Sequence, residues 1–463
     1  MRIKRQSLLL VVCLGFFALL VGSRYLVAFP TIPSPTSPNN NAVTDTVFWD
    51  AKISHPYVLK GSDGDVLVNF QVKGQALKSS ERAPVNLVLV IDRSGSMSEE
   101  EKLEYAKEAA KRIISGLGSG DRIGIVAYST EVELLYPIQY LNDKGRANAV
   151  VDSLYPTDST NLSGGLSAGI DQLKSLKRDG YINRVILLSD GLANVGITDV
   201  GQLSRVASQA AENSIQITTM GLGLNYDENL MMSLAEYGAG NYYFIESPKQ
   251  LAKIFEKEFG RILATVAKDS IMYLSLAPGV EIKEIYGYTH SVKGRRVQIT
   301  LGDIFSGLER NILVKLSAPT DKLGKNQLLE AWFEFTDILK NNQAVSMQRV
   351  LEYESTNQKD KVVANENKDV IARGVSVDAA SQMYQATFYY EKGDSDGALN
   401  NIKKALGRIS ALNSSPQRSM ATLKQEDELR KAVDMFQAAP ALESDLGKGM
   451  IKDYKAKARE QQK

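Results

Sequence analysis

Between residues 85 and 264, short apolar segments alternate with amphipathic ones, and this alternation constrains the fold more than any other feature. The apolar segments are VNLVLVI (85–91), RIGIVAY (122–128), RVILLSD (184–190), IQITTMGLG (215–223) and NYYFIE (241–246). The segments between them carry apolar residues at helical spacing, as in Leu162, Leu166, Ile170 and Leu173. Continuously apolar strands that alternate with helices are typical of a parallel sheet covered on both faces. The sequence therefore predicts an α/β domain with a doubly wound, mostly parallel sheet and helices on both faces. A capping box of Ser98 and Glu101 is expected to begin its first helix.

The regions on either side of this domain have strand patterns of another kind. In DVLVNFQVKG (65–74), Val66, Val68, Phe70 and Val72 alternate with polar residues, which is typical of a strand with one buried face. We interpret residues 47–82 and 266–355 as two parts of one β-sandwich, into which the α/β domain (84–264) is inserted. Residues 363–463 have apolar residues at helical spacing and are predicted to form a C-terminal α-helical region.

The N-terminus has the pattern of an export signal. A basic segment, MRIKRQ, precedes the apolar run SLLLVVCLGFFALLVG, so residues 1–29 are predicted to be a signal peptide or a signal anchor. Residues 30–46 are rich in Pro, Ser and Asn and are expected to be an extended linker. The protein is therefore expected to be exported, and either anchored in a membrane with its bulk outside the cytoplasm or secreted into a periplasm or medium.

Composition excludes several classes of function. The 55 basic and 54 acidic residues nearly balance, which argues against a nucleic-acid partner. Cys13 is the single cysteine, and His55 and His290 are the two histidines. A disulfide framework, a thiolate metal site and a serine–histidine hydrolase in the α/β domain are therefore not expected.

Acids and hydroxyls follow the predicted strands where each strand ends. Asp92 ends the first apolar strand, with Ser94 and Ser96 at alternate positions after it, and Asp190 ends a later strand. Thr160 lies in a loop that approaches a helix. The carboxyl ends of parallel strands meet at one edge of a sheet, where ligands bind. A set of oxygen donors without nitrogen or sulfur suits Mg²⁺, with Mn²⁺ or Ca²⁺ as alternatives.

These residues, in this order, resemble the signature of von Willebrand factor type A domains. The family motif is Asp-x-Ser-x-Ser, then a distant Thr and a distant Asp, and it forms a metal-ion-dependent adhesion site. The resemblance implies that Asp92, Ser94, Ser96, Thr160 and Asp190 hold a metal ion to which a partner protein's acidic side chain binds. It also implies that the helix nearest the C-terminal end of this domain, at residues 248–264, shifts when a ligand binds. Asp158-Ser159 depart from the Gly-Gly of many relatives. The strand-rich flanks and helical tail resemble bacterial exported type A domain proteins.

Two other functions remain open. The protein could be an envelope scaffold or assembly factor that uses its helical tail, with a structural metal. A haloacid-dehalogenase-like magnesium phosphatase also has an Asp at the end of its first strand, but it needs a second acid two positions later, where this chain has Ser94. We therefore expect a binding protein that is not an enzyme.

Overall fold

The computed structural model describes residues 44–77, 82–157, 159–176 and 180–463, which all lie in one compact unit, Asn39–Lys463. The predicted signal segment, residues 1–29, and most of the predicted linker lie outside the described residues. Among the helices of the described ranges, none combines the length and the apolar character that a membrane span requires.

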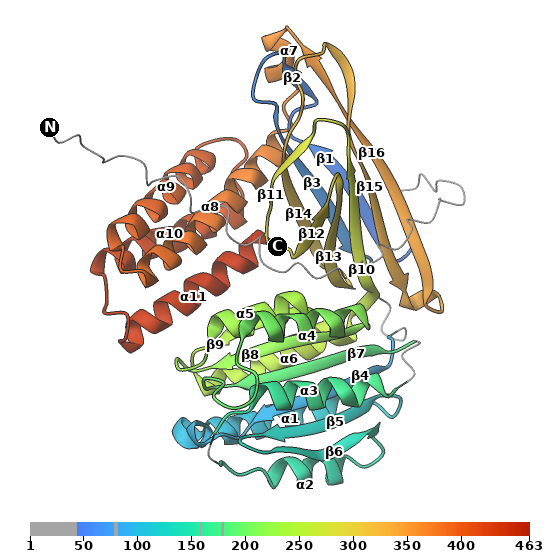
Figure 1. Cartoon of the computed structure of the whole chain (residues 1–463), viewed down its shortest axis with the longest axis vertical. Helices are drawn as coiled ribbons and strands as arrows, with labels where there is room; N and C mark the ends of the chain where they lie inside the picture. Colours follow the sequence, from blue (N-terminus) through green and yellow to red (C-terminus); the bar gives the residue numbers. More distant parts are fainter. Residues whose placement is uncertain (1–43, 78–81, 158, 177–179) are drawn as a thin grey trace, which may run out of the picture. The chain divides into compact units, whose positions relative to one another are not determined.

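The α/β domain has one six-stranded sheet, in the order β6-β5-β4-β7-β8-β9 (Figure 1). Its strands are β4 (Val85–Asp92), β5 (Arg122–Tyr128), β6 (Val132–Tyr140), β7 (Ile182–Ser189), β8 (Ile215–Leu222) and β9 (Ala239–Ile245). Its helices are α1 (Lys102–Gly116), α2 (Lys144–Asp152), α3 (Leu162–Lys174), α4 (Val200–Glu212), α5 (Glu228–Tyr237) and α6 (Leu251–Leu263), with short 3₁₀ turns η1 (Gly95–Glu101) and η2 (Pro248–Gln250). Neighbouring strands are parallel except for the β5–β6 pair.

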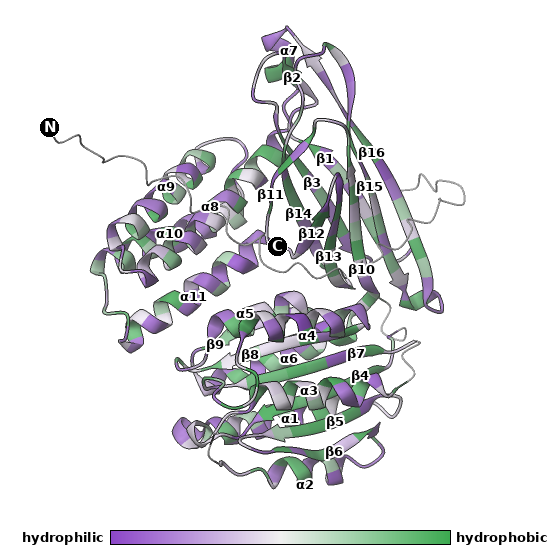
Figure 2. Cartoon of the chain, in the orientation of Figure 1, coloured by the Kyte–Doolittle hydropathy of each residue, from purple (hydrophilic) through white to green (hydrophobic). Residues whose placement is uncertain are grey.

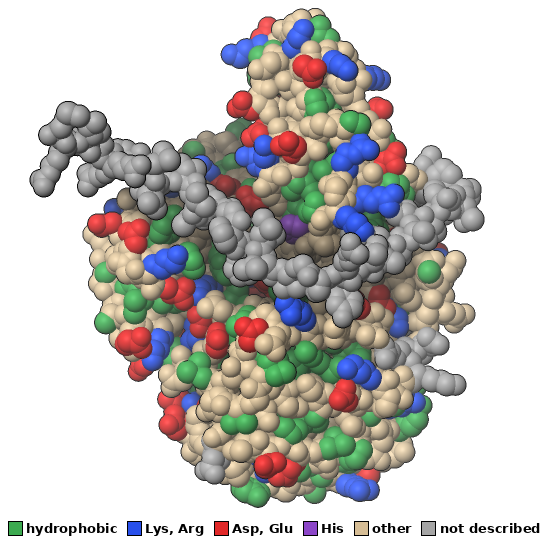
Figure 3. All heavy atoms as spheres, in the orientation of Figure 1, with side chains coloured by type: hydrophobic (Ala, Val, Ile, Leu, Met, Phe, Trp, Pro, Cys, Tyr) green, Lys and Arg blue, Asp and Glu red, His purple; other side chains and the backbone are tan. Residues whose placement is uncertain are grey.

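Both faces of the four central strands of this sheet, β5, β4, β7 and β8, are buried. On β4, Leu87 and Leu89 belong to a core with α1, α2 and α6, whereas Val88 and Val90 belong to a second core with α3, α4 and α5. Figure 2 shows the central strands as hydrophobic along their length and the helices as mixed. The predicted fold class, a mostly parallel sheet with helices on both faces, is confirmed. On the molecular face drawn in Figure 3, basic and acidic side chains are interspersed over the described surface.

Two local features differ from the sequence analysis. Strand β6 pairs antiparallel with β5 at the sheet edge. It was not predicted, because Pro137 interrupts its apolar run and a proline within such a run argues against a strand. The capping box expectation was wrong. Ser98 Oγ donates to Gly95 O at 2.7 Å, and Glu101 has a left-handed φ of 57° and makes no side-chain cap. Helix α1 therefore begins at Lys102, after the η1 turn.

Strands from both sides of the α/β domain form two further sheets. One has the order β1-β3-β14-β11 and the other has the order β12-β13-β10-β15-β16-β2. The N-terminal strands are β1 (Val47–Ile53), β2 (Tyr57–Leu59) and β3 (Asp65–Gly74). The later strands are β10 (Thr265–Leu276), β11 (Glu281–Ile285), β12 (His290–Lys293), β13 (Arg296–Phe305), β14 (Glu309–Ser317), β15 (Gly324–Asp337) and β16 (Gln343–Thr356), with a 3₁₀ turn η3 (Ile338–Lys340). One apolar core joins the two sheets, and in it the rings of Trp49 and Phe333 lie 5.8 Å apart.

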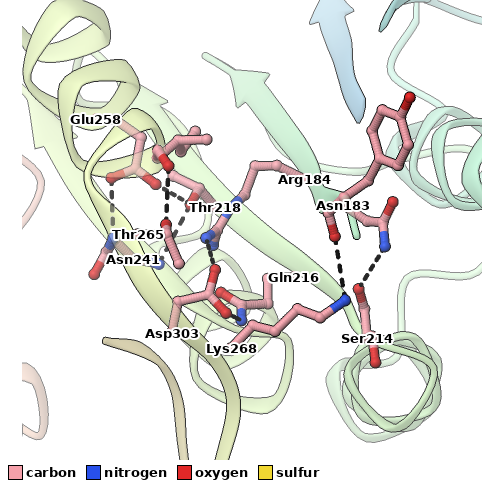
Figure 4. Close-up of polar contacts among 12 residues, drawn as sticks. Asn183, Arg184, Ser214, Gln216, Thr218, Asn241, Glu258, Thr265, Lys268 and Asp303 are labelled. Carbon is pink, nitrogen blue, oxygen red and sulfur yellow. Dashed lines mark hydrogen bonds and ion pairs between the residues drawn. The ribbon is translucent and has the colours of Figure 1, made fainter. Parts of the chain in front are cut away.

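A buried polar network joins the α/β domain to β13 (Figure 4). Arg184 on β7 is fully buried, and its Nη2 donates to Asp303 Oδ2 on β13 at 2.8 Å. Gln216 on β8 donates to the other oxygen of the same carboxylate. Burial raises the pKa of Asp303 to about 6, although the charge of Arg184 opposes this shift. Loss of the charge on Asp303 would therefore leave the Arg184 guanidinium buried without a counter-charge.

Helix α6 is held to the sheet by a second group of this network. The buried carboxylate of Glu258 accepts hydrogen bonds from Thr218 Oγ1 at 2.6 Å, from Asn241 Nδ2 at 2.9 Å and from the Tyr243 hydroxyl at 2.8 Å. Ala264 is the single residue between α6 and β10. The α/β domain thus passes into the β-sheets without a linker.

The C-terminal region is helical, with α7 (Lys359–Ala364), α8 (Lys368–Glu391), α9 (Ser395–Asn413), α10 (Met420–Ala438) and α11 (Asp445–Gln462). Helix α11 contacts the first turn of α5 through ion pairs. Lys452 Nζ lies 2.6 Å from Glu228 Oε2, and Lys455 Nζ lies 2.9 Å from Glu228 Oε1 and 2.6 Å from Glu391 Oε1. Both lysines are buried. Burial alone would raise the pKa of Glu228, but the charges of the two lysines and their hydrogen bonds lower it to about 2.

These ion pairs predict a pH-dependent attachment of α11. Because the pKa of Glu228 is lower in the folded protein than its ordinary value of 4.5, its stabilisation is complete above about pH 4.5 and is lost as the pH falls towards 2. At neutral pH, Glu228→Gln removes the negative charge that both buried ammonium groups share. The substitution is expected to lower the free energy of unfolding by about 3–5 kcal/mol. Hydrogen exchange of α11 should become faster in this variant at pH 7. Glu443→Gln is the matched control, since its side chain is 93% exposed. Equal exchange in the two variants would show that these pairs do not hold α11.

Candidate metal centre

The parallel pairing of β4 with β7 brings two chain ends together at one edge of the sheet. Ile91 pairs with Leu188, so the next residues, Asp92 and Ser189, are neighbours where the strands end. Asp92 is fully buried. Its Oδ2 accepts from Ser189 Oγ at 2.8 Å, and its Oδ1 accepts from the backbone N–H of Ser94 at 2.8 Å. These two hydrogen bonds hold the Asp92 carboxylate in one orientation.

The two serines of the loop after β4 connect Asp92 with Asp190. Ser94 Oγ and Ser96 Oγ lie 3.2 Å apart, and Ser96 Oγ donates to Asp190 Oδ1 at 2.7 Å. Asp190 directly follows β7 and is fully buried. Four of the five predicted site residues, Asp92, Ser94, Ser96 and Asp190, therefore lie in one connected cluster.

Thr160 reaches the same cluster from the loop before α3. Its backbone N–H donates to Asn194 Oδ1 at 2.8 Å, and its carbonyl accepts from the N–H of Asn194 at 3.1 Å and of Val195 at 3.3 Å. A Cβ atom placed on Gly191 would lie 3.5 Å from both Ser96 Oγ and Thr160 Oγ1. The two hydroxyls therefore face the same small space above Gly191. The structure describes Thr160 itself, whereas Asp158, at which the chain departs from the family motif, is outside the described residues.

The electrostatics of the cluster favour a cation. Burial and the neighbouring charge of Asp190 raise the pKa of Asp92 to about 6, and the hydrogen bonds from Ser94 and Ser189 only partly offset this shift. Two carboxylates held close together and away from water repel each other, so a positive charge between them lowers their free energy. Among the described residues, no cluster of three or more His, Cys, Asp or Glu side chains offers an alternative metal site.

Lys102, which the sequence did not indicate as a site residue, supplies a positive charge next to these carboxylates. Lys102, the first residue of α1, has a side chain that is 6% exposed, and its Nζ lies 3.0 Å from Asp190 Oδ2. The ammonium group also lies 3.5 Å from the carbonyl oxygen of Ser96 and 3.5 Å from Glu99 Oε2. Ser189 and Asn194 were missed as well. A hydroxyl beside a strand-ending acid could have indicated Ser189, but no local pattern distinguishes Lys102 from the other lysines of α1.

The donor set suits a hard divalent cation. Two carboxylates, Asp92 and Asp190, and three hydroxyls, those of Ser94, Ser96 and Thr160, supply oxygen alone, which is the ligand type that Mg²⁺ and Mn²⁺ prefer. The Lys102 ammonium group lies next to Asp190, at the edge of this set of oxygen donors. The residues present therefore fit such an ion, which would supply Lewis acidity towards an incoming anionic ligand.

Comparisons with known proteins identify the domain that carries this cluster. The sequence pattern described as von Willebrand factor type A domain matches residues 86–257. The uncharacterized protein YfbK of Escherichia coli is 30% identical over 292 residues, which are 58% of this chain and 50% of YfbK. The E3 ubiquitin-protein ligase WAV3 of Arabidopsis thaliana is 30% identical over 56% of this chain and 34% of its own length. The mouse inter-alpha-trypsin inhibitor heavy chain H3 is 27% identical over 40% of this chain and 22% of its own length.

The chain spans half or less of the length of these three relatives. Among solved structures, a von Willebrand factor type A protein from Catenulispora acidiphila has a TM-score of 0.70 and covers 90% of this chain and 98% of its own, at 15% identity. The ArnB paralog VWA2 from Sulfolobus acidocaldarius has a TM-score of 0.60 over 89% of this chain and 98% of its own, at 19% identity. At these identities the likeness shows the fold alone. Residues 86–257 of this chain thus form a von Willebrand factor type A domain.

Proposed function

We propose that this chain is an exported protein, either membrane-tethered or secreted, that binds a partner protein through a divalent cation and is not an enzyme. The cation, Mg²⁺ or in its place Mn²⁺ or Ca²⁺, would be held by Asp92, Ser94, Ser96, Thr160 and Asp190. The observation that carries the proposal is the meeting of two buried carboxylates and three hydroxyls at one sheet edge. Because the hydroxyls add ligands without charge, the ion keeps positive character, and an acidic side chain of the partner is its natural further ligand.

Exposed apolar side chains around this edge support a protein as the partner. Leu192 follows Gly191 and is 60% exposed, and Ile197, in the same loop, is 43% exposed. Tyr155 is 61% exposed, and its ring lies 5.4 Å from the guanidinium carbon of Arg93, the residue between Asp92 and Ser94. Large apolar side chains gathered near a polar centre are typical of protein interaction sites.

The relatives and the charge distribution also agree with a protein partner. Homologues of the type A domain include an E3 ubiquitin-protein ligase and an inter-alpha-trypsin inhibitor heavy chain, whose names fit roles in protein interaction. The formal charge of +1 argues against a nucleic-acid partner, and on the face drawn in Figure 3 basic and acidic side chains are interspersed. Export rests on the sequence of residues 1–29 alone, and a retained apolar segment would be the contact with a membrane.

The metal-binding part of the proposal is tested by titrating the full chain, purified in detergent, with Mn²⁺ and Mg²⁺ in a calorimeter. The wild type is expected to bind one ion. Asp92→Ala removes one of the two carboxylates and should lower the affinity at least about 100-fold, while circular dichroism shows the fold retained. Asp171→Ala is the control, because Asp171 is a 67% exposed acid of the same domain and should bind as wild type does. A wild type that binds neither ion would refute the proposed site.

The partner-binding part is tested by capture from the envelope fraction of the producing cells, with the bound proteins identified by mass spectrometry. A specific partner is expected with Mg²⁺ present, and it should be lost with chelator and in Asp92→Ala. Leu192→Ser should weaken the same association about 10-fold without changing metal affinity, since it removes an exposed apolar contact. Association that survives metal removal but is lost when residues 363–463 are deleted would instead favour the scaffold role of the helical tail.

A further inference from the structure

Lys102 is built into the candidate metal centre as a buried positive charge. Its side chain is 6% exposed and its ammonium group lies 3.0 Å from Asp190 Oδ2. Gly223, which follows β8, lies beside this side chain, since a Cβ atom there would be in van der Waals contact with it, 3.7 Å from Lys102 Cε and 3.9 Å from its Nζ. Glu99 contacts the same ammonium group at 3.5 Å, but its side chain is 65% exposed and its charge is screened by water. Asp190 is therefore the buried counter-charge of Lys102.

This lysine changes the charge that a bound ion would leave at the site. The buried set of Asp92, Asp190 and Lys102 has two negative charges and one positive charge. A divalent cation would leave that set with one net positive charge, whereas without the lysine the two carboxylates would neutralise the ion. A single carboxylate from a partner would then bring the set with Lys102 to neutrality. The lysine thus opposes the metal alone and favours the metal together with an anionic ligand.

We propose that Lys102 weakens binding of the divalent cation alone and strengthens binding of the partner's carboxylate to the metal-loaded site, so that the loaded site selects an anionic ligand. The inference rests on the proposed metal-dependent binding function and adds the regulation of that site. The metal and the carboxylate attract each other directly and reciprocally, so a lysine that strengthens acetate binding to the loaded site also increases the effect of a given acetate concentration on metal binding. Two like charges about 5 Å apart change an equilibrium constant about 4-fold at the dielectric constant of water and about 250-fold at an effective value of 20. The effect is therefore large enough to measure.

The test measures Mn²⁺ affinity of the full chain in detergent, by the electron paramagnetic resonance signal of free Mn²⁺. Titrations are run in sodium acetate and in sodium chloride at equal ionic strength, with acetate as the carboxylate probe at concentrations that do not saturate the metal-loaded site. In the wild type, acetate should tighten Mn²⁺ binding at least about 4-fold. In Lys102→Met, Mn²⁺ should bind at least about 4-fold more tightly in chloride, and the effect of acetate should fall to less than half. Lys102→Gln is a second neutral variant that keeps a polar contact with Asp190 and should behave in the same way.

Lys107→Met is the matched control, since Lys107 lies on the same helix, is 11% exposed and pairs with Glu104. It should keep both the Mn²⁺ affinity and the acetate effect of the wild type. Neutral variants that bind Mn²⁺ no more tightly than wild type, or that keep the full acetate effect, would overturn the role of Lys102 while leaving the metal site in place. A wild type that binds no Mn²⁺ would overturn the proposed function and, with it, this inference.

Discussion

The parallel pairing of β4 with β7 is the constraint on which the candidate site depends. It places Asp92 and Ser189 side by side where both strands end, and Asp190 follows in the next position. Because both strands are buried on both faces, their ends cannot move without disturbing two apolar cores at once. Two carboxylates are thus held together despite their repulsion, and this arrangement favours a positive charge beside them.

The α/β domain is also held rigidly where it joins the β-sheets. Helix α6 continues into β10 after one residue, and Glu258 ties it to β8 and β9 through three buried hydrogen bonds. A shift of α6, as the family resemblance implies, would have to break these bonds or move the strands with the helix. The Arg184–Asp303 pair connects the sheet to β13 independently of α6. The α/β domain is therefore coupled to the β-sheets by both covalent and polar contacts.

The tail is attached by a different kind of interaction. Lys452 and Lys455 lie buried against Glu228, at the first turn of α5, where the helix dipole alone would favour a negative side chain. The two lysines supply the charge that keeps Glu228 ionised in a poorly hydrated place. Ion pairs of this kind specify where a helix docks more than they add net stability, because both partners lose their hydration.

The sequence by itself determined the buried strands of the α/β domain, the helical faces and the five residues of the candidate site, because apolar periodicity and strand ends are local patterns. It did not determine the edge strand β6, whose apolar run is interrupted by Pro137. It also determined that nitrogen and sulfur ligands are scarce, since Cys13, His55 and His290 are the only cysteine and histidines. The tertiary structure alone decided which other polar groups meet these residues. Lys102 approaches Asp190 from 88 residues away in the sequence, and Arg184 meets Asp303 across 119 residues. Such pairs leave no periodic signal, because each depends on the packing of whole elements rather than on the residues next to it.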